Sequence, residues 1–193
     1  MAKQFDRLQP DHREFIARQR MFFTATAAPT GRINLSPKGL EGLRVIDDNT
    51  VAYLDLTGSG NETAAHILAD GRLTIMFCAF EGPPLILRLY GQGRRLARGT
   101  DAYSELLAKG FDGEETFGTR QIIRLDVELV QTSCGYGVPL LDYKGERPSF
   151  ENWARSKGED GLKLYRAEKN MVSIDGFATG YQAEDENADA TGR

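Results

Sequence analysis

The side chains best suited to hold an anion lie between Arg32 and Arg88. Arg32 and Lys38 flank a Ser36-Pro37 pair, an arrangement that would bring two cations and a hydroxyl to one rim. Arg88 stands inside the apolar run LILRLY, where a buried guanidinium needs an anionic partner, unless the strand lies at an edge and Arg88 faces water. Because a guanidinium fork matches phosphate oxygens, the segment suggests a phosphate site. Solvated surface charge is the alternative for Arg32 and Lys38.

A glycine-rich turn, TGSGNET at residues 57–63, comes directly before a predicted helix. Glycines let backbone amides approach an anion, and a helix N-terminus adds free N–H groups. Ser59, Asn61 and Thr63 add polar side chains to this turn. An ordinary strand-to-helix connection would give the same pattern, and Glu62 counts against an anion unless its carboxylate points away.

Other kinds of catalytic site find little support in the residue types. The imidazoles are His12 and His66, and Cys78 and Cys134 lack metal-ligand spacing, so we expect no metal site. The chain has no Gly-x-Ser-x-Gly motif, which argues against a serine hydrolase. The GQG at residues 91–93 lacks the third glycine of a dinucleotide fingerprint.

The elements that must position these residues are mostly strands joined by turns. Alternation of apolar residues and turn signals predicts strands at 21–27, 32–35, 45–46, 50–56, 73–80, 85–96 and 120–132. We expect helices that begin at Asp11 as N-cap, at 62–69 after Asn61, at 100–109, at Ser149 and at 161–170. The segment 36–39 should end its strand, because proline cannot donate to a ladder. Strands that do not alternate with helices predict a mainly β fold, an antiparallel β-barrel with flanking helices.

The chain of 193 residues carries a net charge of -4, with 24 Lys and Arg against 28 Asp and Glu. We expect a barrel domain at 1–140, a helical extension at 141–182 that packs on the barrel or on a dimer partner, and a disordered acidic tail at 183–193. Most of the negative charge falls in that tail, and a nearly neutral body argues against nucleic-acid binding. No run approaches the roughly 18 apolar residues of a membrane span, and the first residues lack a signal peptide, so we expect a cytoplasmic protein.

Several segments together resemble the pyridoxamine 5′-phosphate oxidase-like flavoproteins, the FMN-binding split barrels. They are FFTATA at 22–27, RINLSPKG at 32–39, AYLDLTGSGNET at 52–63, and residues 73–93. CGYGVP at 134–139 and KNMVSIDG at 169–176 resemble the C-terminal part of an uncharacterised subgroup. The resemblance implies a homodimer with FMN at the subunit interface, and an oxidoreductase that acts on an unidentified small molecule. The flavin would then supply the redox chemistry.

The resemblance places Arg32, Lys38 and Arg88 at FMN-contacting positions of the family. Gly60 and Asn61 stand where the vitamin-forming oxidase has an Arg-Lys pair, and its substrate-binding Arg and His are not recognisable near Trp153. Phosphate binding must then rely on the remaining cations, Ser59 and backbone amides. The expected cofactor-binding residues are Arg32, Ser36, Lys38, Ser59, Asn61, Thr63 and Arg88, with no catalytic residue assigned.

We expect FMN rather than FAD or NAD, because few cations suit a single phosphate and no parallel-strand fingerprint is present. Three other functions stay open from the sequence. The protein could be a non-catalytic flavin carrier, an interaction module without a cofactor, or a haem-binding or haem-degrading split-barrel relative. In the haem case His66 is the plausible axial ligand.

Overall fold

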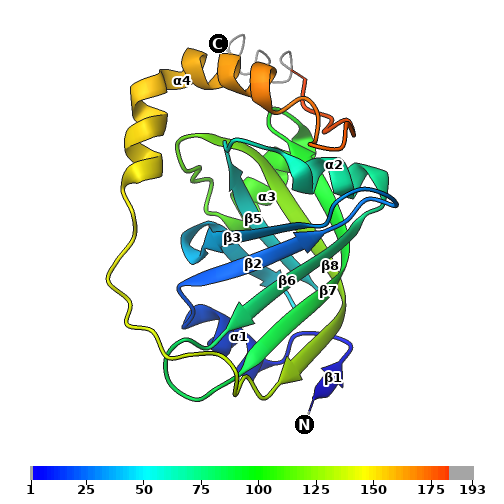
Figure 1. Cartoon of the computed structure of the whole chain (residues 1–193), viewed down its shortest axis with the longest axis vertical. Coiled ribbons are helices and arrows are strands. Elements are labelled where there is room, and N and C mark those ends of the chain that lie inside the picture. Colours follow the sequence, from blue (N-terminus) through cyan, green and yellow to red (C-terminus); the bar gives the residue numbers. More distant parts are fainter. Residues whose placement is uncertain (1, 183–193) are drawn as a thin grey trace.

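An antiparallel sheet curled into a half-barrel forms the frame of the molecule (Figure 1). The computed structural model describes residues 2–182. The strand order is β3-β2-β6-β7-β8-β5-β4, and β1 pairs with β8. The strands are β1 (Lys3–Phe5), β2 (Met21–Thr26), β3 (Asn34–Gly39), β4 (Leu43–Asp47), β5 (Thr50–Leu56), β6 (Arg72–Cys78), β7 (Ile86–Ala97) and β8 (Thr119–Ser133). The helices are α1 (Pro10–Ala17), α2 (Glu62–Ala69), α3 (Asp101–Gly110) and α4 (Ser149–Lys169), with a short 3-10 turn at Leu40–Gly42.

The predicted class, an antiparallel β-barrel with flanking helices, is confirmed. At the N-terminus one strand was missed and one helix start was wrong. The strand β1 was not predicted, because three residues carry too short a pattern. The first helix begins at Pro10 after Gln9 rather than after Asp11, and the Gln9 N–H donates to His12 Nδ1 at 3.1 Å.

Pro37 lies inside β3 instead of ending it, so the predicted break at 36–39 was wrong. β3 is the first strand of the sheet and pairs only with β2, with Pro37 opposite Phe23. An edge strand leaves one side without ladder bonds, which is where proline is tolerated. The strand therefore continues far enough to place Ser36 and Lys38 on the same face, toward the barrel interior.

The barrel interior is filled by alternate residues of the strands, packed together with α1. Its most buried members include Phe22, Tyr53, Ile75, Phe77, Leu87, Leu89, Ile123, Leu125 and Val130. A second cluster lies between the sheet and α3, with Tyr103, Leu106 and Phe111 against Ala52, Leu54 and Ile122. These two cores hold the strands whose ends carry the polar residues described below.

The opposite side of β3, β2, β6 and β7, which we call the outer face, carries no helix across it in Figure 1. The strand register aligns Pro37, Phe23, Met76 and Arg88 in one row of this face. The next row aligns Leu35, Ala25, Thr74 and Tyr90. These side chains are partly or fully exposed, and Leu35 has 64% of its surface exposed. The row through Pro37, Phe23 and Met76 is thus apolar and ends at the guanidinium of Arg88.

The chain after β8 runs through residues 134–148 without regular structure and then forms α4 (Figure 1). α4 is kinked at Gly158, whose φ of 66° is left-handed, and this agrees with the two helices predicted there. α4 and the residues after it contact the barrel of the same chain, at the end where α2 begins. The predicted acidic tail at 183–193 lies outside the described residues. No helix within residues 2–182 is long and apolar enough to cross a membrane.

Candidate functional site

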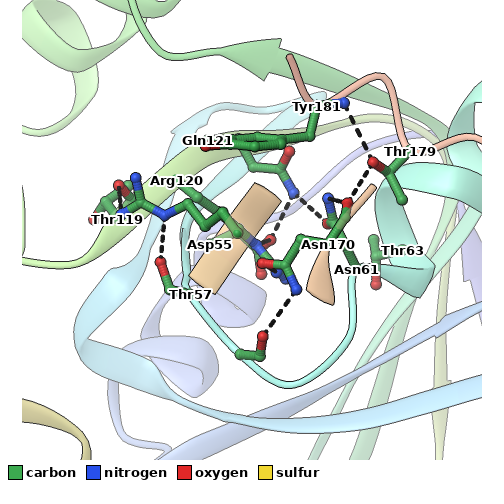
Figure 2. A network of polar contacts seen from close by, with 12 residues as sticks. Asp55, Thr57, Asn61, Thr63, Thr119, Arg120, Gln121, Asn170, Thr179 and Tyr181 are labelled. Atoms are coloured by element: carbon green, nitrogen blue, oxygen red, sulfur yellow. Dashed lines mark hydrogen bonds and ion pairs between the residues drawn. The ribbon is translucent and has the colours of Figure 1, made fainter. Parts of the chain in front are cut away.

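The buried carboxylate of Asp55 is the centre of a polar network at one end of the barrel (Figure 2). Asp55 lies on β5 and is 1% exposed. Its Oδ1 accepts a hydrogen bond from Lys38 Nζ of β3 at 3.1 Å. Its Oδ2 accepts from Arg120 Nε at 2.9 Å and Gln121 Nε2 at 2.7 Å, both on β8. One side chain therefore ties the β3 edge of the sheet to its other half.

The electrostatics of this group favour an anion nearby. Burial by itself raises the pKa of Asp55, but the charges of Arg120 and Lys38 and the hydrogen bonds from β8 outweigh it and hold the pKa below its usual value. Two cations share this one carboxylate, so the group carries one excess positive charge. Lys38 Nζ also lies 5.3 Å from the centre of the Tyr53 ring.

The turn between β5 and α2 is tied to this network by its carbonyl groups. Arg120 Nη1 donates to the Gly60 carbonyl at 2.9 Å, and Asn170 Nδ2 donates to the Gly58 carbonyl at 3.0 Å. In a planar trans peptide the N–H points opposite to the C=O, so the next amides, those of Ser59 and Asn61, point away from the network. Within residues 2–182 neither amide donates to a protein acceptor, and the Asn61 side chain does not cap α2.

A chain of short polar contacts continues from α2 to β3. Asn34 Nδ2 donates to Thr63 Oγ1 and to Thr26 Oγ1, each at 3.1 Å, and Ser36 Oγ donates to Asn34 Oδ1 at 3.1 Å. Thr26 Oγ1 also lies 3.1 Å from His66 Nδ1. The side-chain amide of Asn34 thereby links Thr63, in the first turn of α2, to Ser36 in the middle of β3.

The structure brings five of the seven predicted residues together and separates the other two. Lys38 and Asn61 belong to the Asp55 network, in which Asn61 Oδ1 accepts from Gln121 Nε2 at 2.8 Å. Ser36 and Thr63 belong to the contacts of Asn34, and Ser59 lies on the exposed side of the turn.

The two remaining arginines lie apart from that group. Arg32 forms an ion pair with Asp175. Arg88 lies on the outer face and donates to Ser133 Oγ at 3.0 Å. Lys38 faces the interior and is separated from Arg88 by β2 and β6. The expected grouping of three cations around one phosphate is therefore not present within one subunit.

Sequence reasoning missed Asp55, Arg120, Gln121 and Asn170 as site residues. Asp55 did carry a signal, since an acid inside an apolar strand needs a cation. Arg120 and Gln121 carried a similar signal, because they are polar residues at the start of an apolar strand. Asn170 carried none, because its partners lie 50 and 112 residues away in the chain.

A separate cleft of about 950 Å³ opens between the end of α1, the β6–β7 loop and residues 141–144. Its apolar lining includes Phe15, Met21, Phe80, Leu85, Leu141 and Tyr143. Met21 precedes Phe23 by two residues on β2 and so belongs to the outer face. The cleft therefore borders the face that carries Arg88, and its volume is that of a small-molecule pocket.

Comparison with known proteins agrees with this architecture. Residues 8–134, well over half of the chain, match the family model described as pyridoxamine 5′-phosphate oxidase. The chain belongs to this family. A family member from Aspergillus flavus, the pyridoxamine 5′-phosphate oxidase family protein ustO, is 37% identical over 191 residues, which is 90% of this chain and 76% of that protein. Residues 135–182 lie beyond the family match.

Two solved structures share the split-barrel fold of this pyridoxamine 5′-phosphate oxidase family protein. A candidate pyridoxamine 5′-phosphate oxidase from Lactobacillus delbrueckii has a TM-score of 0.51 at 18% identity, and covers 65% of this chain and 94% of its own. A single-residue variant of HupZ from Group A Streptococcus has a TM-score of 0.51 at 23% identity, with 65% and 98% covered. At these identities the likeness bears on the fold alone.

The role of Asp55 leads to a prediction about stability. Asp55→Asn leaves Lys38 and Arg120 partly or fully buried without an anion, so we expect the free energy of unfolding at pH 7 to fall by about 3–5 kcal/mol. Because the pKa of Asp55 is lower in the folded protein than the unfolded value of about 3.9, its contribution is present above about pH 4 and is lost as the pH falls further. Urea unfolding between pH 7 and pH 3 measures both effects.

The matched control is Asp48→Asn, which removes an exposed ion pair with Arg13. We expect this control to cost less than about 1 kcal/mol. The wild type should lose stability more steeply than Asp55→Asn as the medium becomes acidic. An Asp55 variant as stable as the Asp48 variant, with an unchanged pH profile, would contradict this role for the buried carboxylate.

Proposed function

We propose that the protein is an FMN-binding homodimer and an oxidoreductase that exchanges electrons between the flavin and a small molecule. The observation that carries this proposal is the turn at residues 57–63. The Gly58 carbonyl points into the network, so the amide of Ser59, the exposed residue of this turn, faces away from it, beside a group with one excess positive charge. Amides of this kind and a nearby cation suit a phosphate.

The sheet topology and the short turn support FMN over a dinucleotide. A pyrophosphate with an adenosine calls for a longer glycine-rich turn after a parallel strand, whereas the strand pairs within residues 2–182 are antiparallel. Ser59 and its amide would hold a single terminal phosphate, and Lys38, whose side chain is 25% exposed, would supply a positive charge.

The outer face supports a dimer. It combines exposed Leu35 and Pro37 with the partly buried Phe23 and Met76, and an apolar patch of this kind marks an interaction site. Arg88 lies on β7, at one side of this face, and no acidic side chain among residues 2–182 forms an ion pair with it. Contact between two such faces would bury Arg88, which would then need a flavin oxygen or a carboxylate across the interface.

The cleft supports a catalytic role over that of a flavin carrier. Its apolar lining and its volume of about 950 Å³ would accommodate a small organic substrate beside the outer face. The bound flavin would supply the redox chemistry, while the chain binds and orients both molecules. Free cysteines at 78 and 134 are in keeping with a reducing, cytoplasmic environment.

Haem binding has weaker support. His66 is 1% exposed, and its Nδ1 lies 3.1 Å from Thr26 Oγ1. An imidazole enclosed in this way offers no face to an iron approaching from the surface, so the axial ligand considered for the haem alternative is not accessible.

A thermal melting series with FMN, riboflavin, FAD and haemin tests the cofactor. A ligand that binds only the folded protein adds about 2.7 kcal/mol of stability at a hundredfold excess over its Kd. We expect FMN to raise the melting temperature most, and riboflavin to lag because it lacks the phosphate. Equal shifts with FMN and riboflavin would count against the phosphate site, and a response to haemin alone would overturn the flavin proposal.

Sedimentation of two leucine variants tests the dimer. Leu35 on the outer face and Leu164 on α4 are both exposed, at 64% and 73%. We expect Leu35→Asp to shift the protein toward the monomer and to weaken FMN binding, because a charge would enter the interface. Leu164→Asp should remain a dimer. A Leu35→Asp protein that stays dimeric would exclude the outer face as the interface.

A further inference from the structure

The residues that follow α4 form a compact segment over the start of α2, and we call residues 170–181 the C-terminal clasp. A tight turn joins Val172 and Ala178, which pair across an isolated bridge, and Thr179 and Tyr181 are buried. This segment lies outside the family match, which ends at residue 134. Its side chains nevertheless enter the polar network of the candidate site (Figure 2).

Asn170 is the first residue of the clasp and is fully buried. Its side-chain Oδ1 accepts from Arg120 Nη1 at 2.7 Å, and its Nδ2 donates to the Gly58 carbonyl at 3.0 Å. Its own carbonyl accepts from Thr179 Oγ1 at 2.6 Å and from Asn61 Nδ2 at 3.4 Å. The side-chain amide of Asn170 thus links Arg120 of β8 to the turn before α2.

The tip of the clasp is held at two further points. The Asp175 carboxylate accepts from the Arg32 N–H at 2.7 Å and pairs with its guanidinium. The Ile174 N–H donates to the Glu62 carboxylate at 3.0 Å, so Glu62 is turned toward the clasp. Gly31 has a φ of +92°, and a Cβ there would lie 2.6 Å from Asp175 Oδ2, so the β2–β3 turn is shaped to this contact.

The turn at residues 57–60 needs such external support. Gly58 and Gly60 have wide backbone freedom, and a turn that contains both can present its amides in many directions. Arg120 fixes the Gly60 carbonyl, but the Gly58 carbonyl is fixed by Asn170. The direction of the Ser59 amide, which shares the peptide with that carbonyl, therefore depends on the clasp.

We propose that Asn170 is a positioning residue for the phosphate group of the cofactor. It acts through the Gly58 carbonyl, which sets the Ser59 amide, and the clasp keeps Asn170 in place. The inference rests on the proposed FMN function and assigns a role to a part of the chain that the family match does not reach. Preorganised donors of this kind raise affinity because binding does not have to order them.

Asn170→Asp tests the inference. The carboxylate keeps an acceptor for Arg120 but replaces the donor to Gly58 with an oxygen that repels that carbonyl. Fluorescence titration should show FMN affinity reduced about tenfold, the size of one hydrogen bond to a charged group, with riboflavin affinity unchanged. Val172→Ala is the matched control, because Val172 is on the same clasp, is exposed and has no polar side-chain group that could hold a carbonyl of the turn. It should bind both flavins like the wild type.

A purely structural role for Asn170 would weaken FMN and riboflavin together, and no role would weaken neither. Either result overturns the proposal. Asn170→Ala removes both side-chain bonds without adding a charge, and so separates lost positioning from the repulsion between a new carboxylate and the phosphate. It should also lose FMN affinity and keep riboflavin affinity, and an alanine variant that binds FMN like the wild type would overturn the proposal.

Backbone order measured by NMR relaxation separates this inference from the proposed function. In the absence of any flavin, the order parameters of residues 58–60 should be lower in Asn170→Asp than in the wild type or in Val172→Ala, because the Gly58 carbonyl has lost its donor. Wild-type protein that binds no flavin would refute the proposed function and with it the phosphate role, while lower order in the variant would still show that Asn170 holds the turn. Unchanged order parameters would refute the positioning role even in a protein that binds FMN.

Discussion

A single buried negative charge, that of Asp55, holds together two parts of the sheet that the backbone leaves unpaired. β3 is an edge strand and β5 lies next to the other edge, so no ladder joins them. Removing a carboxylate from water is costly, and the cost is offset only if cations and donors surround it. Lys38 reaches it from β3, and Arg120 and Gln121 reach it from β8. At this point β3 and β5 are linked by the ion pair of Lys38 and Asp55 and not by backbone hydrogen bonds.

The same interactions fix the parts of the chain that would meet a cofactor. Arg120 contacts Asp55, the Gly60 carbonyl and Asn170, so the turn before α2 and the C-terminal clasp depend on one guanidinium. Stability and ligand binding are therefore coupled, since a change at Asp55 would loosen the turn as well. Coupling through one polar network also means that effects of neighbouring variants should not add.

The sequence predicted the local features well, because they depend on short-range patterns. Apolar alternation located the strands, and Asn61 and Thr100 were correctly placed before α2 and α3. The error at Pro37 arose because an edge position is a property of the whole sheet, which the local sequence does not show. The cations of the candidate site could be named, but the face of the sheet that each one occupies depends on the strand register.

The contacts between β5, β8 and Asn170 were beyond prediction, because they join segments far apart in the chain. The strand pattern predicted an antiparallel barrel, and the resemblance, which the family match over residues 8–134 supports, specified the split-barrel family. The C-terminal part of the chain contributed no residue to the predicted site, yet Asn170 from this part completes the polar network around Asp55 in the structure.

The presence of FMN in the protein is the point on which the other proposals depend. An absorption spectrum of the purified protein, together with native mass spectrometry, identifies any bound cofactor and the number of subunits at once. We predict flavin bands and a dimer that carries the mass of one FMN for each subunit. A Soret band, or a dimer that stays free of cofactor after incubation with excess FMN, would contradict it.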